Sequence, residues 1–337
     1  MLKILDDEST IRRCQRLFIR ALRPFVTDRV AVKIGHPGES VRARVFWVEG
    51  PGIWFHSKAI AEGRYWNAFG IGKPAAGSAV SSTIEINIPT ISLDRKIGGA
   101  FAQDEAGKLF LVHRGKIGGR RGVGKSLFEA QYRGVWAEVE DGDTRSTVVV
   151  IGEMRSPLFV RQLAQFVRKI EAVKDLGADD DQQARIFFDD DRFREEFIGG
   201  RYVPAGRDYT SECNRDLAVL DLAHRLRELG MRVKSNPDGD LFTSDPAGRI
   251  EAVFAVLIGV GSPFLEQGVA RLLLRSLNLP REPRRLLVMP AKPEEGWDAL
   301  LLKLGIHVIP YSWENGVATF AGLADRLAKM DVGKTES

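Results

Sequence analysis

Cysteine is scarce in this chain, and its scarcity excludes two classes of protein. Cys14 and Cys213 are the two cysteines among 337 residues, and they lie far apart. A disulfide-stapled scaffold needs several paired cysteines, and a zinc site of the usual kind needs closely spaced ligand pairs. We therefore expect two buried free thiols.

Long apolar runs are also lacking. No run reaches the roughly 18 apolar residues that a membrane-spanning helix requires. The opening MLKILDDESTIRRCQ carries acids where a secretory signal peptide has an apolar core. Hydrophobic residues make up 44% of the chain and charged residues 28%, as in globular proteins. We expect a soluble, cytoplasmic protein with no membrane partner.

The length favours two domains, because 337 residues exceed one typical hydrophobic core. The segment AVKDLGADDDQQARIFFDDD combines a glycine with clustered acids, which is typical of a boundary. We place the break near residues 175–185, which gives domains at 1–175 and 186–330. The expected fold class is an α+β N-terminal domain with a substantial β-sheet, followed by an α/β domain.

Charge is unevenly distributed between the two halves. The net charge is +4, but residues 1–173 hold 27 Lys and Arg against 18 Asp and Glu, whereas the remaining residues hold 22 against 27. The first part therefore carries +9 and the second −5. Such asymmetry favours a phosphate-bearing partner, DNA or RNA, for the first domain.

Helical and strand periodicities alternate in the first domain. Apolar spacing near 3.6 predicts a helix over residues 8–25, and Pro157 opens a second helix. Strand-like runs bounded by Gly, Pro or Asp occur at residues 29–35, 43–50, 53–57, 81–89, 106–115, 135–141 and 146–153.

A glycine-rich basic segment, HRGKIGGRRGVGKS, covers residues 113–126. Glycines allow a close backbone approach, and cations among them suit the phosphates of a nucleic-acid backbone. A basic hairpin without a ligand is the simpler alternative. The candidate phosphate-binding residues in and near this segment are Arg95, Lys96, Arg114, Lys116, Arg120, Arg121 and Lys125.

The same segment matches the P-loop pattern GxxxxGK[ST] from Gly119 through Gly124 and Lys125 to Ser126. A P-loop leaves its strand directly, but five residues separate the run LFLVH from Gly119. We keep a nucleotide-binding P-loop as a minor alternative.

Aromatic residues between positions 47 and 69 raise a narrower possibility. Tyr65 and Trp66 are candidates for stacking on an unpaired base, because readers of flipped bases use aromatic faces beside a basic groove. Alternating apolar residues bury such rings in any sheet, so a core position is the commoner interpretation. Residues 80–135 also resemble an unnamed domain that accompanies nuclease-like modules in bacterial restriction and defence proteins.

The C-terminal third predicts a helix at 211–230, strands at 239–242 and 250–259, a helix at 264–277, and strands at 284–290 and 307–311. This order resembles the core of the restriction-endonuclease-like PD-(D/E)XK nucleases. The resemblance implies a divalent-metal site in which Asp240 holds the metal, supported by Glu212. The next strand of that family carries Glu-x-Lys, but this chain has Ala255 and Leu257 there.

Alanine and leucine cannot bind a hard cation or activate water, so the resemblance implies a nuclease fold with an eroded site. Glu251 shares a strand face with Ala255, but four residues of strand put them about 13 Å apart. We expect a nucleic-acid-binding protein of bacterial restriction or antiviral defence, without a cofactor. Its pseudo-nuclease domain would serve binding or assembly, as a homodimer or with another defence-system protein.

Two further alternatives stay open. One is a magnesium-dependent endonuclease that uses Glu212, Asp240 and Glu251, since two or three carboxylates can hold a metal. The other is a protein-interaction subunit whose basic loop contacts an acidic partner.

Overall fold

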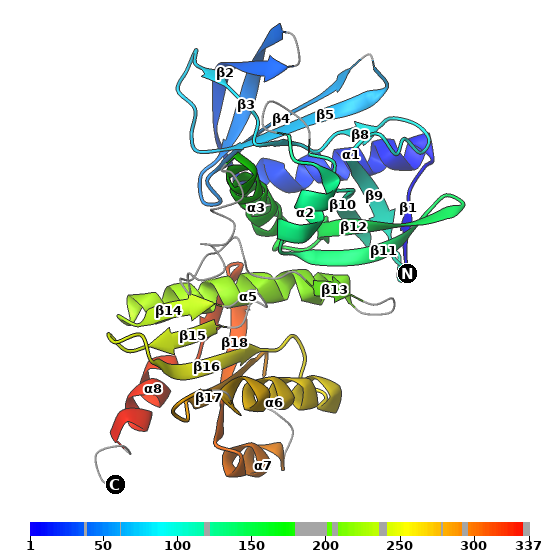
Figure 1. Cartoon of the computed structure of the whole chain (residues 1–337). Helices are drawn as coiled ribbons and strands as arrows, with labels where there is room; N and C mark the ends of the chain where they lie inside the picture. The colour runs from blue at the N-terminus through cyan, green and yellow to red at the C-terminus, as the bar shows by residue number, and fades with distance from the viewer. Residues whose placement is uncertain are drawn as a thin grey trace. The chain divides into compact units, whose positions relative to one another are not determined.

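The computed structural model describes residues 1–36, 39–60, 62–117, 122–178, 201–203, 208–235, 241–277, 279–291 and 296–332. The chain forms two compact units, and the described residues up to Cys213 belong to the first and those from Asn214 to the second. Residues 201–213, which we expected in the second domain, therefore lie in the first unit. Both units mix helices and sheets (Figure 1). No helix in the described ranges is long and apolar enough to cross a membrane.

One sheet of the first unit is built on an antiparallel meander. It consists of β2 (Val26–His36), β3 (Glu39–Val48), β4 (Ile53–Ile60) and β5 (Arg64–Ile71). Short strands extend its two edges: β6 (Ala79–Val80) pairs with β2, and β7 (Ile84–Glu85) and β8 (Ile88–Pro89) pair with β5.

A second sheet closes on itself. Its strands run in the order β1 (Leu2–Ile4), β9 (Gly99–Gln103), β10 (Leu109–His113), β12 (Thr144–Glu153), β11 (Val135–Asp141) and β13 (Arg201–Val203). Because β1 pairs with both β9 and β11, five strands form a ring. The other half of β11 pairs with β13.

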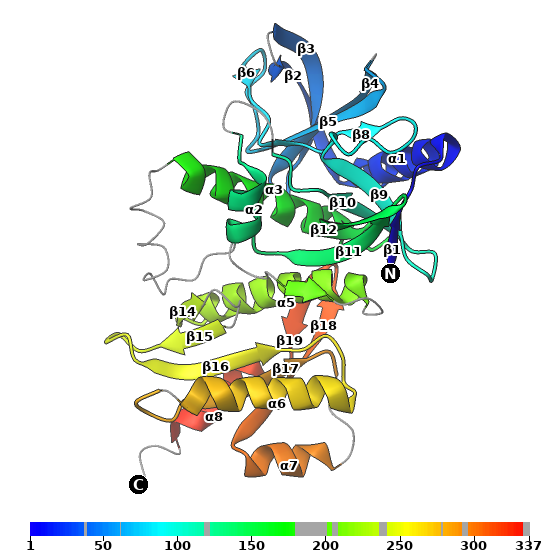
Figure 2. The same ribbon diagram turned by 45° about the vertical axis from the view of Figure 1, so that its right-hand side comes forward.

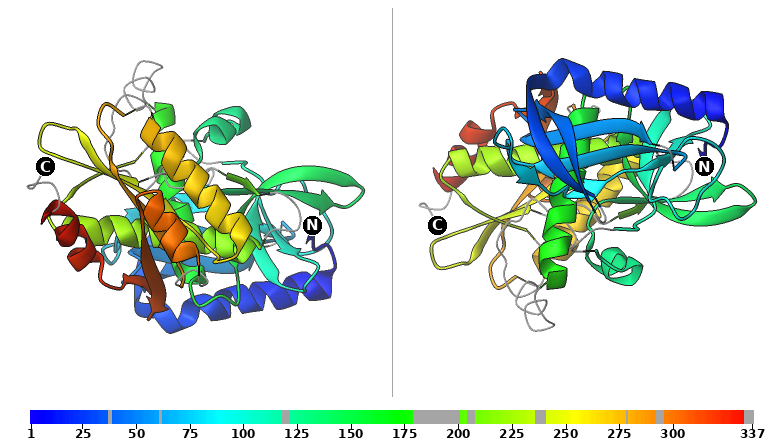
Figure 3. Two further views of the ribbon diagram at one scale, coloured as in Figure 1. Left: turned by 90° about the horizontal axis from the view of Figure 1, so that it is seen from below. Right: turned by 90° about the horizontal axis from the view of Figure 1, so that it is seen from above.

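Helices α1 (Glu8–Leu22) and α3 (Phe159–Ala178) share one apolar cluster with residues of both sheets. A one-turn 3₁₀ helix, η1 (Arg23–Phe25), follows α1, and α2 (Lys125–Gln131) lies between β10 and β11. The side chain of Asp7 caps α1 by accepting the Thr10 N–H at 2.7 Å. Figure 3 shows α1 along the periphery of the first unit.

Two contacts fix which face of α1 points outward. Ile11, Cys14 and Phe18 are buried on one side of the helix. Beside them Nε2 of Gln15 donates to Oδ1 of the fully buried Asn67 on β5 at 2.8 Å. The arginines of the helix are thereby left on the opposite, exposed face.

The second unit is a six-stranded sheet between helices (Figure 2). Along the chain it contains α5 (Tyr209–Glu228, from Asn214), β14 (Arg232–Ser235), β15 (Leu241–Ser244), β16 (Ile250–Val256), α6 (Ser262–Leu277), β17 (Arg284–Met289), α7 (Trp297–Lys303), β18 (Ile306–Glu314), β19 (Val317–Phe320) and α8 (Leu323–Val332). Strands β14 to β16 are mutually antiparallel, and β17 and β18 continue parallel to β16. Helices α5 and α8 pack on one face and α6 and α7 on the other.

Candidate nucleic-acid interface

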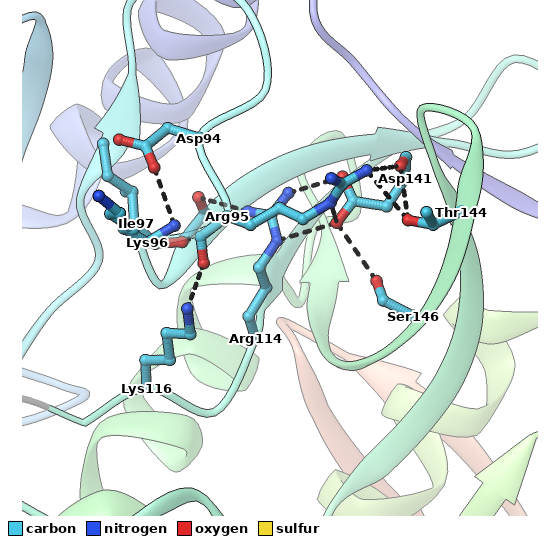
Figure 4. A network of polar contacts seen from close by, with 10 residues as sticks. Asp94, Arg95, Lys96, Ile97, Arg114, Lys116, Asp141, Thr144 and Ser146 are labelled. Carbon is cyan, nitrogen blue, oxygen red and sulfur yellow. Dashed lines mark hydrogen bonds and ion pairs between the residues drawn. The ribbon is translucent and has the colours of Figure 1, made fainter.

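A buried ion pair anchors the glycine-rich basic segment. Arg114 is 7% exposed, and its Nη2 donates to Oδ1 of Asp141 at 3.0 Å while its Nε donates to Oδ2 at 3.3 Å (Figure 4). Asp141 is fully buried at the end of β11. Removing one partner of such a pair costs about 3–5 kcal/mol, because the other charge stays buried. Arg114 is thus a structural residue, which corrects the expectation that it contacts phosphate.

Arg95 and Lys116 strengthen the same network. Nη2 of Arg95 donates to the carbonyl oxygen of Asp141 at 2.6 Å and to Oγ1 of Thr144 at 3.0 Å. Nζ of Lys116 donates to the carbonyl oxygen of Arg95. Arg95, Lys96 and Lys116 are all exposed, but Arg95 and Lys116 also make hydrogen bonds that hold the loop. Arg120 and Arg121 lie outside the described residues.

The surroundings of Lys125 differ from those of a P-loop. Strand β10 is antiparallel to both of its neighbours, and an antiparallel bridge joins Ile117 to Val123 before the helix starts. Helix α2 has seven residues, and Nζ of Lys125 lies 3.5 Å from Oε1 of Glu129. A P-loop instead leaves a strand directly into its helix, with the lysine reaching phosphate. Gly119 lies outside the described residues.

The two stacking candidates are packed inside the first unit. Trp66 is 2% exposed and lies edge-on to His56, with ring centroids 5.1 Å apart. Tyr65 is half-buried against the main apolar cluster. The structure corrects the expectation for Trp66, because a buried ring cannot receive a base.

The two positions that carry Glu and Lys in the nuclease family are occupied here by buried apolar residues. Ala255 and Leu257 are 2% and 5% exposed and belong to the cluster under α6. Leu257 lies so close to Gly268 that a Cβ there would be 2.9 Å from its Cδ2. The strand positions that would carry Glu and Lys in a nuclease are therefore core positions here.

The carboxylates of the endonuclease alternative are not gathered in one described site. Glu212 lies in the part of α5 that belongs to the first unit, and Glu251 is half-buried near the start of β16 in the second. Asp240 lies outside the described residues. Within the described ranges no group of three or more His, Cys, Asp or Glu could hold a metal ion.

A further cationic site lies on α1, to which no function was assigned from the sequence. A pocket of about 370 Å³ is lined by four arginines, Arg13, Arg16, Arg20 and Arg155, together with Leu17 and Leu109. The four arginines are exposed. None of them forms an ion pair with an acidic residue in the described part of the chain. We call these four residues the arginine face.

The geometry of α1 explains how three of the four arginines meet. Positions 13, 16 and 20 follow the i, i+3, i+7 spacing of one helix face and span about 10 Å at 1.5 Å per residue. Arg155 comes from the turn between β12 and α3. The spacing of the three arginines on α1 can be recognised in the sequence, but the position of Arg155 beside them depends on tertiary structure.

Cys14 is fully buried close to the arginine face. Burial raises the pKa of the Cys14 thiol, and nearby Arg13 and Arg155 oppose this effect. Cys14 and Cys213 are both buried and free, as expected.

No family model, curated protein or solved structure matches the chain.

Proposed function

We propose that the first unit binds the phosphate backbone of DNA or RNA through the arginine face. The observation that carries the proposal is the convergence of four arginines from two elements on one pocket, with no acid among the described residues that line it. Arginine stays charged at all working pH values and presents a planar fork of donors that matches phosphate oxygens. The excess of +9 in residues 1–173 would attract the same ligand over a longer range.

The length of the arginine face favours an extended polyanion. Arg13, Arg16 and Arg20 are separated by helix rises of about 4.5 and 6 Å, so their guanidinium groups can engage several phosphates along one strand. Lys96 is a further exposed cation of the first unit. Arg120, Arg121 and Lys125 remain candidates for additional backbone contacts.

For the second unit we propose a restriction-endonuclease-like core that serves assembly rather than catalysis. The order α5, β14, β15, β16, α6 and β17, with three antiparallel strands followed by a parallel one, supports this relationship. Burial of Ala255 and Leu257 in an apolar cluster supports the loss of chemistry. Exposed Leu274 and Leu277 on α6 suit a partner, either a second copy of the chain or another protein of a bacterial defence system.

The arginine face can be tested by replacing one of its members. We expect Arg16→Ala to weaken binding of a labelled single-stranded oligonucleotide and to reduce the slope of log K against log salt by about 0.7, the value for one lost phosphate contact on a single strand. Fluorescence anisotropy across a salt series, with magnesium added to a parallel set to detect cleavage, provides the measurement.

Arg12→Ala is the matched control for this test. Arg12 lies on the same helix and is exposed, but it pairs with Glu8 and does not line the pocket. Equal losses in the two variants, or unchanged binding in Arg16→Ala, would contradict the proposal. Cleavage of the substrate by the wild-type protein would overturn the non-catalytic role of the second unit.

A further inference from the structure

A second pocket continues the arginine face toward the end of α1. Its volume is about 610 Å³, within the range of small-molecule sites, and Arg23, Val26, Thr27, Asp28, Arg29 and Phe46 line it. Arg23 follows Arg20 by three residues, so it extends the spacing of the arginine face by one helical step. We call this site the strand-end pocket.

One wall of the strand-end pocket is a stack of planar groups. The guanidinium carbon of Arg29 lies 5.5 Å from the ring centroid of Phe46. Phe46 in turn stacks on Phe55, with centroids 5.1 Å apart and an interplanar angle of 26°. Phe55 is buried in the core and forms the inner end of this row of planar groups. Arg29 is exposed and forms the outer end. Arginine planes held in this way are platforms on which nucleobases stack.

A carboxylate lines the same pocket. Oδ2 of Asp28 is 2.7 Å from Nζ of Lys73, and Oδ1 accepts the backbone N–H of Arg29 at 2.7 Å. The hydrogen bond from Lys73 lowers the pKa of Asp28, so the group is ionised at neutral pH. Two carboxylate oxygens offer about four lone-pair sites, which leaves acceptor capacity for a ligand. A site for phosphate alone would not include this negative charge.

We propose that the strand-end pocket holds one unpaired guanine of the strand whose phosphates lie on the arginine face. The base stacks on Arg29, and its adjacent N1–H and N2–H groups donate to the carboxylate of Asp28. Arg23 contacts the phosphate that joins this nucleotide to its neighbour. Watson–Crick pairing covers those donors, so the pocket selects a single-stranded or flipped base. The inference rests on the proposed function, because the arginine face must bind the strand first.

The test compares two labelled oligothymidylates of equal length, one of which has a single central guanine. Both carry the same phosphate charge, so the ratio of their affinities isolates recognition of the base. We expect wild-type protein to bind the guanine strand about tenfold more tightly, as for a good bidentate contact to a base. Asp28→Ala should bring the ratio close to one, and Arg29→Ala should weaken binding of both strands and lower the ratio.

Arg42→Ala is the control, because Arg42 is an exposed arginine on β3, four residues from Phe46, that does not line the pocket. It should preserve the ratio, and circular dichroism should confirm that all variants are folded. A wild-type ratio of one, or a ratio unchanged by Asp28→Ala, overturns the guanine site even if Arg16→Ala still weakens binding. Absence of binding to both strands overturns the site and the arginine face together.

Discussion

At the scale of single residues, charge is used in two different ways in the first unit. Arg114 and Asp141 neutralise each other out of solvent and fix the end of β11. The arginine face instead presents cations to solvent, and the described residues that line its pocket include no acidic partner. From the sequence alone, the glycine-rich segment was a stronger candidate for phosphate binding than the arginine face. A dense cluster of Arg and Lys in the sequence does not reveal which of them form ion pairs with a buried aspartate.

His113 is a residue whose burial makes stability depend on pH. Desolvation, with Arg114 nearby, lowers its pKa from 6.5 to about 3. Its Nδ1 accepts the N–H of Gly115 at 3.1 Å, so the neutral ring carries its proton on Nε2, which has no hydrogen-bond partner among the described residues. Between about pH 3 and 6.5, His113 is therefore protonated in the unfolded chain but stays neutral in the folded protein.

The sign of the effect follows from that difference in pKa. The contribution of His113 is complete above about pH 6.5 and is lost, at up to about 1.4 kcal/mol per pH unit, as pH falls from there toward 3. We expect His113→Asn, which keeps an acceptor for Gly115, to be less stable at pH 7 but to lose less stability on acidification. Urea unfolding at a series of pH values measures both slopes, and parallel slopes would contradict the burial of a neutral imidazole.

At the scale of elements, strands of both units were predicted in part, and β14 and β19 of the second unit were not anticipated. Apolar runs at 250–259 and 284–290 correspond to β16 and β17, and the helices expected at 211–230 and 264–277 correspond to α5 and α6. In the first unit β5 and β9 were not anticipated, because RYWNAFGI and GAFAQ have glycine and mixed polarity that obscure the period of two. The helix expected at 8–25 ends at Leu22 and continues as η1, since Pro24 cannot donate to an α-helical bond.

The packing of α6 can be tested at Leu257, the residue that follows β16. We expect Leu257→Lys to lower the free energy of unfolding by about 3 kcal/mol or more, because an ammonium group would enter an apolar cluster. Leu257→Met, which keeps volume and polarity, should cost less than about 1.5 kcal/mol. Denaturant midpoints provide the comparison. Equal stability of the Lys and wild-type proteins would mean that this position borders solvent, as it does in a working nuclease site.

At the scale of the whole molecule, charge and chemistry are divided between the two parts of the sequence. The arginine face and the strand-end pocket both lie in the first unit, which contains the part of the sequence with a charge of +9. Residues 174–337 carry −5. The charge asymmetry was available from composition, whereas the position of the two pockets required the folded arrangement of α1, β2, β3 and the turn before α3.

This division predicts where a bound oligonucleotide slows hydrogen exchange. Peptides that cover α1 and η1 should be protected on addition of single-stranded DNA, while peptides from β15 to α8 should be unchanged, because local opening is suppressed where ligand is bound. Mass spectrometry with and without the oligonucleotide makes the measurement. Protection confined to the second unit would contradict the proposal that the first unit carries the nucleic-acid interface.

The closed sheet has a consequence for the order in which the protein folds during synthesis. Leu2 pairs opposite Val139, and the apolar cluster on the same sheet also includes Val203, Tyr209 and Cys213. Contacts between residues this distant in sequence form slowly, because the intervening chain loses conformational entropy before the contacts can stabilise the fold. The first unit therefore cannot complete its core on the ribosome until residue 213 has emerged. The start of α5 thus completes an apolar cluster of the first unit, although the rest of this helix belongs to the second unit.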